Sequence, residues 1–171
     1  MLATLDRFAV RPATPRDAEG IGRVYVDSWR ASYRGILPDA YLDQLDPRMR
    51  AALHHRNLTD GEDLHLVAFD TTHGDIVGFC DAGQSRRGGP WRSEIYTLYL
   101  LAHAKRHGLG RELFERARRD LDGESLIIWV LEKNHHARRF YDALGGTLGG
   151  RFQSRIGGAT VIEQAYVWDR Y

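Results

Sequence analysis

The chain has 171 residues, 43% of them hydrophobic, and its 24 lysines and arginines nearly balance its 23 aspartates and glutamates. This length predicts a single domain over residues 1–171, and the even charge disfavours a nucleic-acid-binding protein. No apolar run reaches the roughly eighteen residues that a membrane span needs, and the N-terminus lacks the apolar core of a secretory signal. With Cys80 as its only cysteine, the chain is expected in the reducing cytoplasm.

The predicted elements follow the order β-α-α-β-β-β-α-β-α-β-β, which is typical of an α/β (α+β) protein with a mixed central sheet. Thr14 and Pro15 indicate a helix start, because threonine caps helices and proline suits the first helical position. The continuous apolar run from Ser125 to Leu131 indicates a strand that is buried on both faces. Strands are expected at 8–12, 64–70, 75–82, 91–101, 125–131, 147–154 and 160–168, and helices at 14–33, within 38–57, and at 109–121 and 134–144.

A basic loop with two glycines, residues 105–111, joins a predicted strand to a predicted helix. The first amides of a helix lack intrahelical partners and carry a partial positive charge, so they suit a phosphate. Leu113 stands where the dinucleotide-binding pattern needs its third glycine, and the chain contains no Walker A string. The loop therefore predicts a phosphate or pyrophosphate site; a glycine turn without a ligand is the alternative.

One face of the predicted helix 134–144 carries Asn134, Ala137, Arg138 and Tyr141, because their spacing is i, i+3, i+4 and i+7. Asn134 at the helix start can cap the helix or donate to a ligand, and the two roles are compatible.

These motifs resemble those of the GNAT superfamily of N-acetyltransferases. The string 105–110 is similar to the family's Q/R-x-x-G-x-G/A pyrophosphate loop, and 134–145 is similar to its N-x-x-A-x-x-x-Y-x-x-x-G segment. Residues 95–100 resemble the strand before that loop, and the order of elements is the GNAT layout with about seven strands. Residues 28–42 resemble the corresponding segment of a bacterial subgroup that includes polyamine acetyltransferases.

The chain departs from the family pattern at four places. Ala102 replaces a frequent proline, Gly146 replaces the usual phenylalanine, and Lys105 and Arg106 take positions more often filled by other residues. None of these changes removes a backbone donor.

The resemblance implies acetyl-CoA as co-substrate, with its diphosphate on the amides of the basic loop. It also implies that the pantetheine arm follows the strand, where the family carries a bulge that frees an N–H for the thioester carbonyl. We expect this bulge near Leu98–Leu100. The implied cofactor-binding residues are Leu98, Tyr99, Leu100, Lys105, Arg106, His107, Gly108, Leu109, Gly110, Arg111, Asn134 and Ala137.

Two residues are candidates for proton transfer. Tyr141 would protonate the departing thiolate as a general acid, and packing in the core beside Phe140 is the alternative. Glu94 would accept a proton from the ammonium group of the acceptor; strand alternation places it on the face of Tyr96 and Leu98. An exposed carboxylate without a role, and a water chain as the base, are the alternatives to Glu94.

The acceptor wall is expected to include Trp29, Tyr33 and Tyr96. No metal is expected, because the histidine pairs point to different sides and do not chelate one ion.

The sequence predicts direct attack of a primary amine on acetyl-CoA, since no cysteine is placed as a nucleophile. A polyamine or other small cationic amine is the first expected acceptor, followed by a peptide N-terminus or an antibiotic. A catalytically silent acyl-CoA-binding module is the alternative class. Neither nucleic acid nor membrane is expected as a partner, and a homodimer is common in the resembled family.

Overall fold

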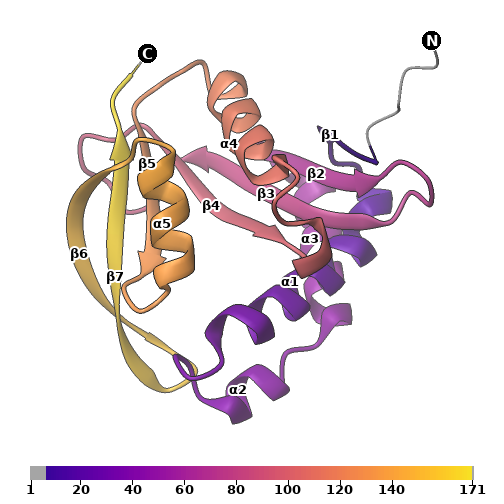
Figure 1. Ribbon diagram of the computed structural model, residues 1–171, viewed down its shortest axis with the longest axis horizontal. Coiled ribbons are helices and arrows are strands. Elements are labelled where there is room, and N and C mark those ends of the chain that lie inside the picture. The colour runs from indigo at the N-terminus through magenta and orange to yellow at the C-terminus, as the bar shows by residue number, and fades with distance from the viewer. Residues whose placement is uncertain (1–6, 171) are drawn as a thin grey trace.

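The computed structural model describes residues 7–170 as a seven-stranded mixed sheet with helices on both faces (Figure 1). The strand order is β1-β2-β3-β4-β5-β7-β6, with every neighbouring pair antiparallel except β4 and β5. The strands are β1 (Phe8–Pro12), β2 (Leu64–Asp70), β3 (Ile76–Gln84), β4 (Ser93–Leu100), β5 (Leu126–Leu131), β6 (Thr147–Ile156) and β7 (Ala159–Trp168). The helices are α1 (Ala18–Tyr33), α2 (Asp39–Asp43), α3 (Pro47–Asp60), α4 (Leu109–Asp120) and α5 (His135–Ala143), with short 3-10 turns at Pro15–Asp17 and Ala102–Ala104.

The predicted α/β class and the seven-stranded sheet are confirmed, and most element ends fall within two residues of their predicted places. The start of α1 shows why a local pattern in the sequence can predict where an element begins. Asp17 accepts hydrogen bonds from the Thr14 backbone N–H at 2.8 Å and from Arg11 at 2.7 Å. This local capping closes a 3-10 turn at the predicted helix start, and α1 proper begins at Ala18.

Two apolar layers hold the helices on opposite sides of the sheet (Figure 1). On one side, α4 buries Leu113 and Phe114 against the strands, and α5 adds Tyr141 to the same cluster. On the other side, α1 packs Ile21 and Val24 on the sheet. Strand β5 contributes alternate residues to both sides, as expected for a strand covered on both faces.

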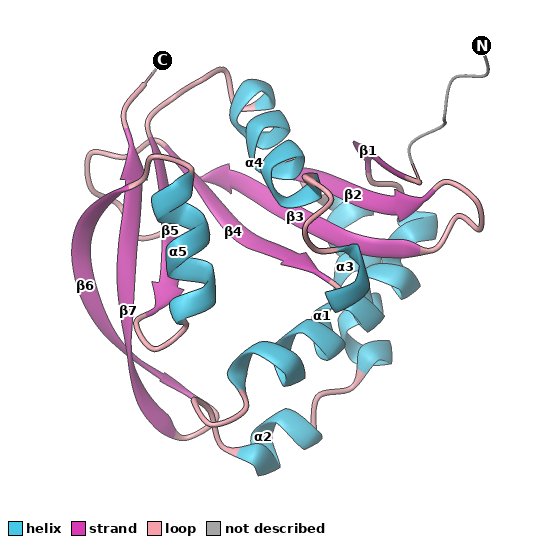
Figure 2. Cartoon of the chain, in the orientation of Figure 1, coloured by secondary structure: helices cyan, strands magenta, loops and turns pink. Residues whose placement is uncertain are grey.

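The sheet opens between its two parallel strands. β4 and β5 pair only from Ser93–Leu126 to Ile95–Ile128, and beyond this point they diverge (Figure 2). Since β3 pairs with the other edge of β4, the edge of β4 that faces β5 has no strand partner after Ile95. The backbone groups along this edge are therefore available to a ligand lying between the two strands.

A bulge lies in β4 at Tyr96, two residues before the expected place. Asp81 pairs with Thr97 and Ala82 with Ile95, so Tyr96 is the additional residue. Alternation without a bulge had placed Glu94, Tyr96 and Leu98 on one face. The additional residue turns Leu98 to the opposite face, where it packs against the α4–α5 cluster, and that part of the expectation was wrong.

No helix within residues 7–170 is both long and apolar enough to cross a membrane.

Candidate active site

A cleft of about 890 Å³ occupies the opening between β4 and β5. Its walls are the diverging halves of the two strands, the last turns of α1, the basic loop before α4 and the exposed start of α5. Most of the predicted site residues line it: Tyr33, Tyr96, Leu98, Tyr99, Leu100, Lys105, Arg106, Gly108, Gly110, Arg111, Asn134, Ala137 and Tyr141. The cleft thus gathers residues from four separate segments of the chain.

One end of the cleft is cationic. Lys105, Arg106 and Arg111 line it from the basic loop, and Arg139 faces them from α5. The pKa of His136 is lowered, first by partial burial and then by the charges of Lys105, Arg139 and Arg106. His136 and the four cations line the same cleft, and such a concentration of positive charge suits the phosphates of a ligand. His136 and Arg139 were not predicted, because the resemblance covered only the Asn134 face of the helix.

The start of α4 presents backbone donors to this end. Gly108, with φ of 81°, is the N-cap residue, and the first intrahelical bond runs from Glu112 N to Gly108 O at 3.0 Å. The amides of residues 109–111 therefore lack intrahelical acceptors. A Cβ on Gly110 would lie 3.1 Å from the Phe140 ring, so glycine lets α4 approach α5 closely.

Two side chains of the basic loop point away from the cleft. Leu109 is buried in the α4 cluster, and the His107 ring packs edge-on against Phe8 at 5.1 Å. Neither residue lines the cleft, so only their backbone groups can contribute to binding.

Three tyrosines meet in the middle of the cleft. The hydroxyls of Tyr33 and Tyr99 lie 3.3 Å apart, and Tyr141 is only 5% exposed while lining the same space. Burial raises the pKa of all three phenols, most clearly those of Tyr99 and Tyr141, to which neighbouring Tyr33 also contributes. Each phenol therefore keeps its proton at neutral pH, and that of Tyr141 lies in a largely dry environment.

Asn134 caps α5: its Oδ1 accepts from the Ala137 N–H at 3.2 Å. The same side chain lowers the pKa of Tyr33, opposing the effect of burial. Because Asn134 also lines the cleft, its capping role leaves the amide group of the side chain beside the ligand space.

Glu94 is buried next to the cleft rather than exposed. It is 7% exposed, and its Oε2 accepts from the Arg86 backbone N–H at 2.9 Å. Glu94 is not among the cleft-lining residues, whereas Tyr96 is. The Tyr96 hydroxyl donates to Gln84 O at 2.8 Å, and the Arg86 guanidinium lies over its ring.

Trp29 belongs to the core and does not line the cleft. Its ring stacks on Tyr25 at 5.0 Å and meets Tyr33 edge-on at 4.9 Å. Trp29 therefore supports Tyr33 from behind. The sequence did not separate the two roles, because both residues fall on the inward side of one helix.

Ser28 was not predicted to line the cleft. It lies one turn before Ser32 on α1, and its buried hydroxyl has no hydrogen-bond partner among residues 7–170. Thr97 was also missed; it donates to Asp81 at 2.8 Å, and Asp81 lies 2.7 Å from the Nδ1 of His65. The position of Thr97 depends on the fold, because the bulge in β4 turns its side chain toward Asp81.

The face of the sheet opposite α4 and α5 holds further residues that were not predicted. Trp129 lines the cleft from β5, and Glu163 on β7 is buried with 8% exposure. Arg87, from the loop between β3 and β4, binds both oxygens of Glu163. Sequence patterns classify Trp129 as a core residue of an apolar strand and Arg87 as a residue of a polar turn, so neither carried a site signal.

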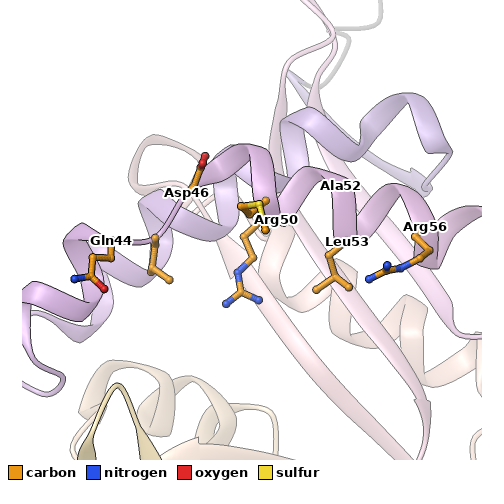
Figure 3. A pocket seen from close by; sticks show the side chains of 8 residues that line it. Gln44, Asp46, Arg50, Ala52, Leu53 and Arg56 are labelled. Atoms are coloured by element: carbon orange, nitrogen blue, oxygen red, sulfur yellow. The ribbon is translucent and has the colours of Figure 1, made fainter.

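A second hollow, of about 510 Å³, lies on the surface of α3 and of residues 44–46 before it (Figure 3). Arg50, Leu53 and Arg56 project from the same side of α3, as Figure 3 shows. Arg50 lies over the ring of Tyr25 at 4.2 Å. The residues that line this hollow include neither a buried phenol nor a glycine-opened helix start like those of the cleft. Among residues 7–170, no three His, Cys, Asp or Glu side chains are grouped as metal ligands.

Comparison with known proteins identifies the family. Residues 24–145 match the model of the acetyltransferase (GNAT) family. The chain belongs to the GNAT family of acetyltransferases. It is 30% identical over 164 residues to the uncharacterized N-acetyltransferase YuaI of Bacillus subtilis, covering 93% of this chain and 91% of that protein.

Solved structures share the fold at lower identity. The PaiA N-acetyltransferase of Thermoplasma acidophilum in complex with coenzyme A superposes with a TM-score of 0.70 at 19% identity, covering 96% of this chain and 99% of that chain. A phosphinothricin acetyltransferase of Sinorhizobium meliloti in complex with acetyl-CoA gives 0.72 at 19% identity, with 96% and 89% covered. The family membership confirms the predicted enzyme class, an acetyltransferase that uses acetyl-CoA as its acetyl donor.

Proposed function

We propose that this acetyltransferase moves the acetyl group of acetyl-CoA directly to a primary amine within the cleft between β4 and β5. One observation carries the proposal: a single cleft runs from the cationic start of α4, past the unpaired edge of β4, to the buried phenol of Tyr141. In this arrangement, each part of acetyl-CoA has a place to bind: the diphosphate, the pantetheine arm and the thioester.

In this proposal the cofactor is held mainly by backbone groups. The amides of residues 109–111 bind the diphosphate, and Lys105, Arg106 and Arg111 add charge. The pantetheine lies against the edge of β4 that the divergence leaves unpaired, adding a strand to the sheet from Leu98 to Leu100. A backbone N–H beside the bulge at Tyr96 then stabilises the tetrahedral intermediate, typically by about 3 kcal/mol.

Proton transfer falls to two residues. Tyr141 protonates the leaving thiolate, because its phenol carries a proton at neutral pH and lines the part of the cleft where the thioester is placed. Glu94 receives the proton of the acceptor ammonium, through water or after the Arg86 loop moves, because its carboxylate now accepts the Arg86 N–H. The sheet thus separates the acid on the α5 side from the base on the opposite side.

Direct attack is favoured over a covalent enzyme intermediate. Cys80 is fully buried, and burial raises the pKa of its thiol well above the ordinary value. A thiol of this kind supplies too little thiolate to act as a nucleophile. We also propose that the enzyme works in the cytoplasm, as expected for a chain whose one cysteine is a free thiol.

The test is CoA release from acetyl-CoA with a panel of polyamines, amino acids, peptides and aminoglycosides. We expect turnover with at least one amine, and a loss of about 10²-fold or more in kcat for Tyr141→Phe at unchanged CoA affinity. Tyr166→Phe is the matched control, because its ring also contacts Tyr141 but its hydroxyl bonds Arg138. Equal kcat for wild type and Tyr141→Phe would remove the phenol from the mechanism, and no turnover with any amine despite CoA binding would point to a silent acyl-CoA-binding module.

A further inference from the structure

An arginine side chain fills a box of two aromatic rings and one buried carboxylate. The guanidinium carbon of Arg87 lies 4.7 Å from the ring centres of both Trp129 and Phe152. Its Nη2 donates to both oxygens of Glu163, at 3.0 and 2.9 Å. These are the contacts by which proteins bind a cation: ring faces around it and a carboxylate against it.

The walls of the box come from three strands of the sheet, and Phe152, on the edge strand β6, is 48% exposed. Trp129 is on β5, Glu163 on β7 and Phe152 on β6, and pairing of Phe152 with Glu163 places the last two side by side. Glu163 is 8% exposed, and a carboxylate buried to this degree requires a cation as partner. The box is therefore a preorganised cation site, whatever group supplies the charge.

The box and the cleft share one wall, the side chain of Trp129. Trp129 lines the cleft together with Tyr33 and Tyr141. Burial raises the pKa of Tyr33, and the charge of Glu163 adds to this effect. A ligand whose reacting amine lies near Tyr141 can thus extend a second group toward Glu163.

The cation now in the box comes from a different kind of segment. Arg87 lies in the loop between β3 and β4, next to Gly88 and Gly89, which both have positive φ. Its side chain is 35% exposed, against 11% for that of Glu163. The arginine therefore enters the box from the solvent side.

We propose that Trp129, Phe152 and Glu163 bind a positively charged group of the acceptor, and that Arg87 occupies this place until the acceptor displaces it. The inference rests on the proposed function and sharpens it: the preferred acceptors carry a second ammonium or guanidinium group besides the amine that is acetylated. Anionic acceptors are disfavoured, because Glu163 already neutralises Arg87 and the same face of the sheet holds the buried Glu94.

The experiment compares 1,5-diaminopentane with 1-aminohexane, two amines of nearly equal size that differ in the second charge. CoA release is measured for the full chain as wild type, Arg87→Ala and the double variant Arg87→Ala/Glu163→Gln. We expect wild type to prefer the diamine about tenfold or more in kcat/KM. Arg87→Ala should lower the diamine KM up to about tenfold at unchanged kcat, because the competing group is gone. Adding Glu163→Gln should abolish the preference.

Arg92→Ala is the matched control for removal of a loop arginine. Arg92 is 78% exposed, and its ion pair with Glu124 spans 4.0 Å, away from the box. We expect Arg92→Ala to keep the wild-type KM for both amines. A higher diamine KM in Arg87→Ala, or a preference for the diamine that survives Glu163→Gln, would overturn the proposal.

A binding measurement without turnover separates this inference from the proposed function. The diamine is titrated into Arg87→Ala and into Arg87→Ala/Trp129→Phe, with tryptophan fluorescence as the readout and thermal unfolding as the check of folding. Saturable quenching that requires Trp129 supports the cation site even if no amine is acetylated. Turnover of amines without this quenching and without charge preference leaves the acetyltransferase proposal standing and rejects the cation site.

Discussion

The two ends of the cleft are built in different ways. The phosphate end consists of consecutive residues, 105–111, whose amides and cations come together as soon as α4 forms. The acceptor end is assembled from side chains of β4, β5, β6, β7 and one loop, which meet only in the finished sheet. A local backbone motif can be kept while strands far apart in sequence change their side chains. In the proposed function, this contrast separates an acetyl-CoA site built from a local motif from an acceptor site built from distant strands.

A truncation in the core of α4, the helix that carries the basic loop, should give the largest effect. Leu113→Ala removes a fully buried side chain from the helix that carries the basic loop, and we expect the free energy of unfolding to fall by about 2–5 kcal/mol. Leu148→Ala, at a site that is 60% exposed, should change it by less than about 0.5 kcal/mol. Denaturant unfolding measures both values. Similar losses for the two variants would show that α4 is not anchored as described.

Backbone strain at the phosphate end should reduce CoA affinity. Gly108→Ala forces an L-residue into a conformation with positive φ, which costs on the order of 1–2 kcal/mol. We expect the Kd for CoA to rise about five- to tenfold by calorimetric titration. Gly88→Ala imposes comparable strain in the acceptor-end loop, where φ is 70°, and should leave the Kd for CoA unchanged. Equal effects on Kd would mean that strain alone, not the phosphate site, is responsible.

The start of α1 should make stability depend on acid pH. Arg11 and the Thr14 N–H lower the pKa of Asp17 in the folded state, so Asp17 stabilises the fold above its unfolded pKa of about 3.9. This contribution is lost as pH falls through the lower, folded-state pKa. Asp17→Asn should cost on the order of 1 kcal/mol at pH 7, and its difference from wild type should shrink below pH 4.

The exposed Asp27 on the same helix provides the control for this experiment. Asp27→Asn should be nearly neutral at both pH values in thermal unfolding. Because α1 ends with Tyr33 in the cleft, a loss of structure at Asp17 would also lower activity. A pH-independent cost of Asp17→Asn would contradict the ion pair as its cause.

A change in salt concentration should give the smallest of the predicted effects. It should weaken binding at the phosphate end more than at the acceptor end. The cations of the phosphate end are largely exposed, so their attraction for CoA is screened as ionic strength rises. We expect the Kd for CoA to rise about three- to fivefold between 20 and 300 mM salt. The preference for the diamine over 1-aminohexane should change less, because Glu163 is buried. A larger salt effect on the preference for the diamine than on the Kd for CoA would place the acceptor's charge in solvent rather than in the box.

Much of the phosphate end and of the middle of the cleft could be predicted from the sequence. Residues 105–111, Asn134, Ala137 and Tyr141 all come from motifs with short, regular spacing, and nearly all of them line the cleft. His107 and Leu109 were included in the same motif, but their side chains turn away because Phe8 and the α4 core attract them. Local spacing thus predicts which backbone meets the ligand better than it predicts where each side chain points.

The acceptor end depended on strand pairing. The bulge at Tyr96 decides that Glu94 and Leu98 lie on opposite faces, and no local pattern in β4 marks it. The β5-β7-β6 order brings together Trp129, Glu163 and Phe152, which are 11 to 34 positions apart in the chain.

The amino-acid sequence by itself determined the helices, the strands and the glycine loop, because helix periodicity, capping and strand alternation act over a few residues. Only the tertiary structure decided the width of the opening between β4 and β5, the burial of Glu94 and Glu163, and the placement of Arg87. These features arise from contacts between distant segments, whose register depends on the whole sheet.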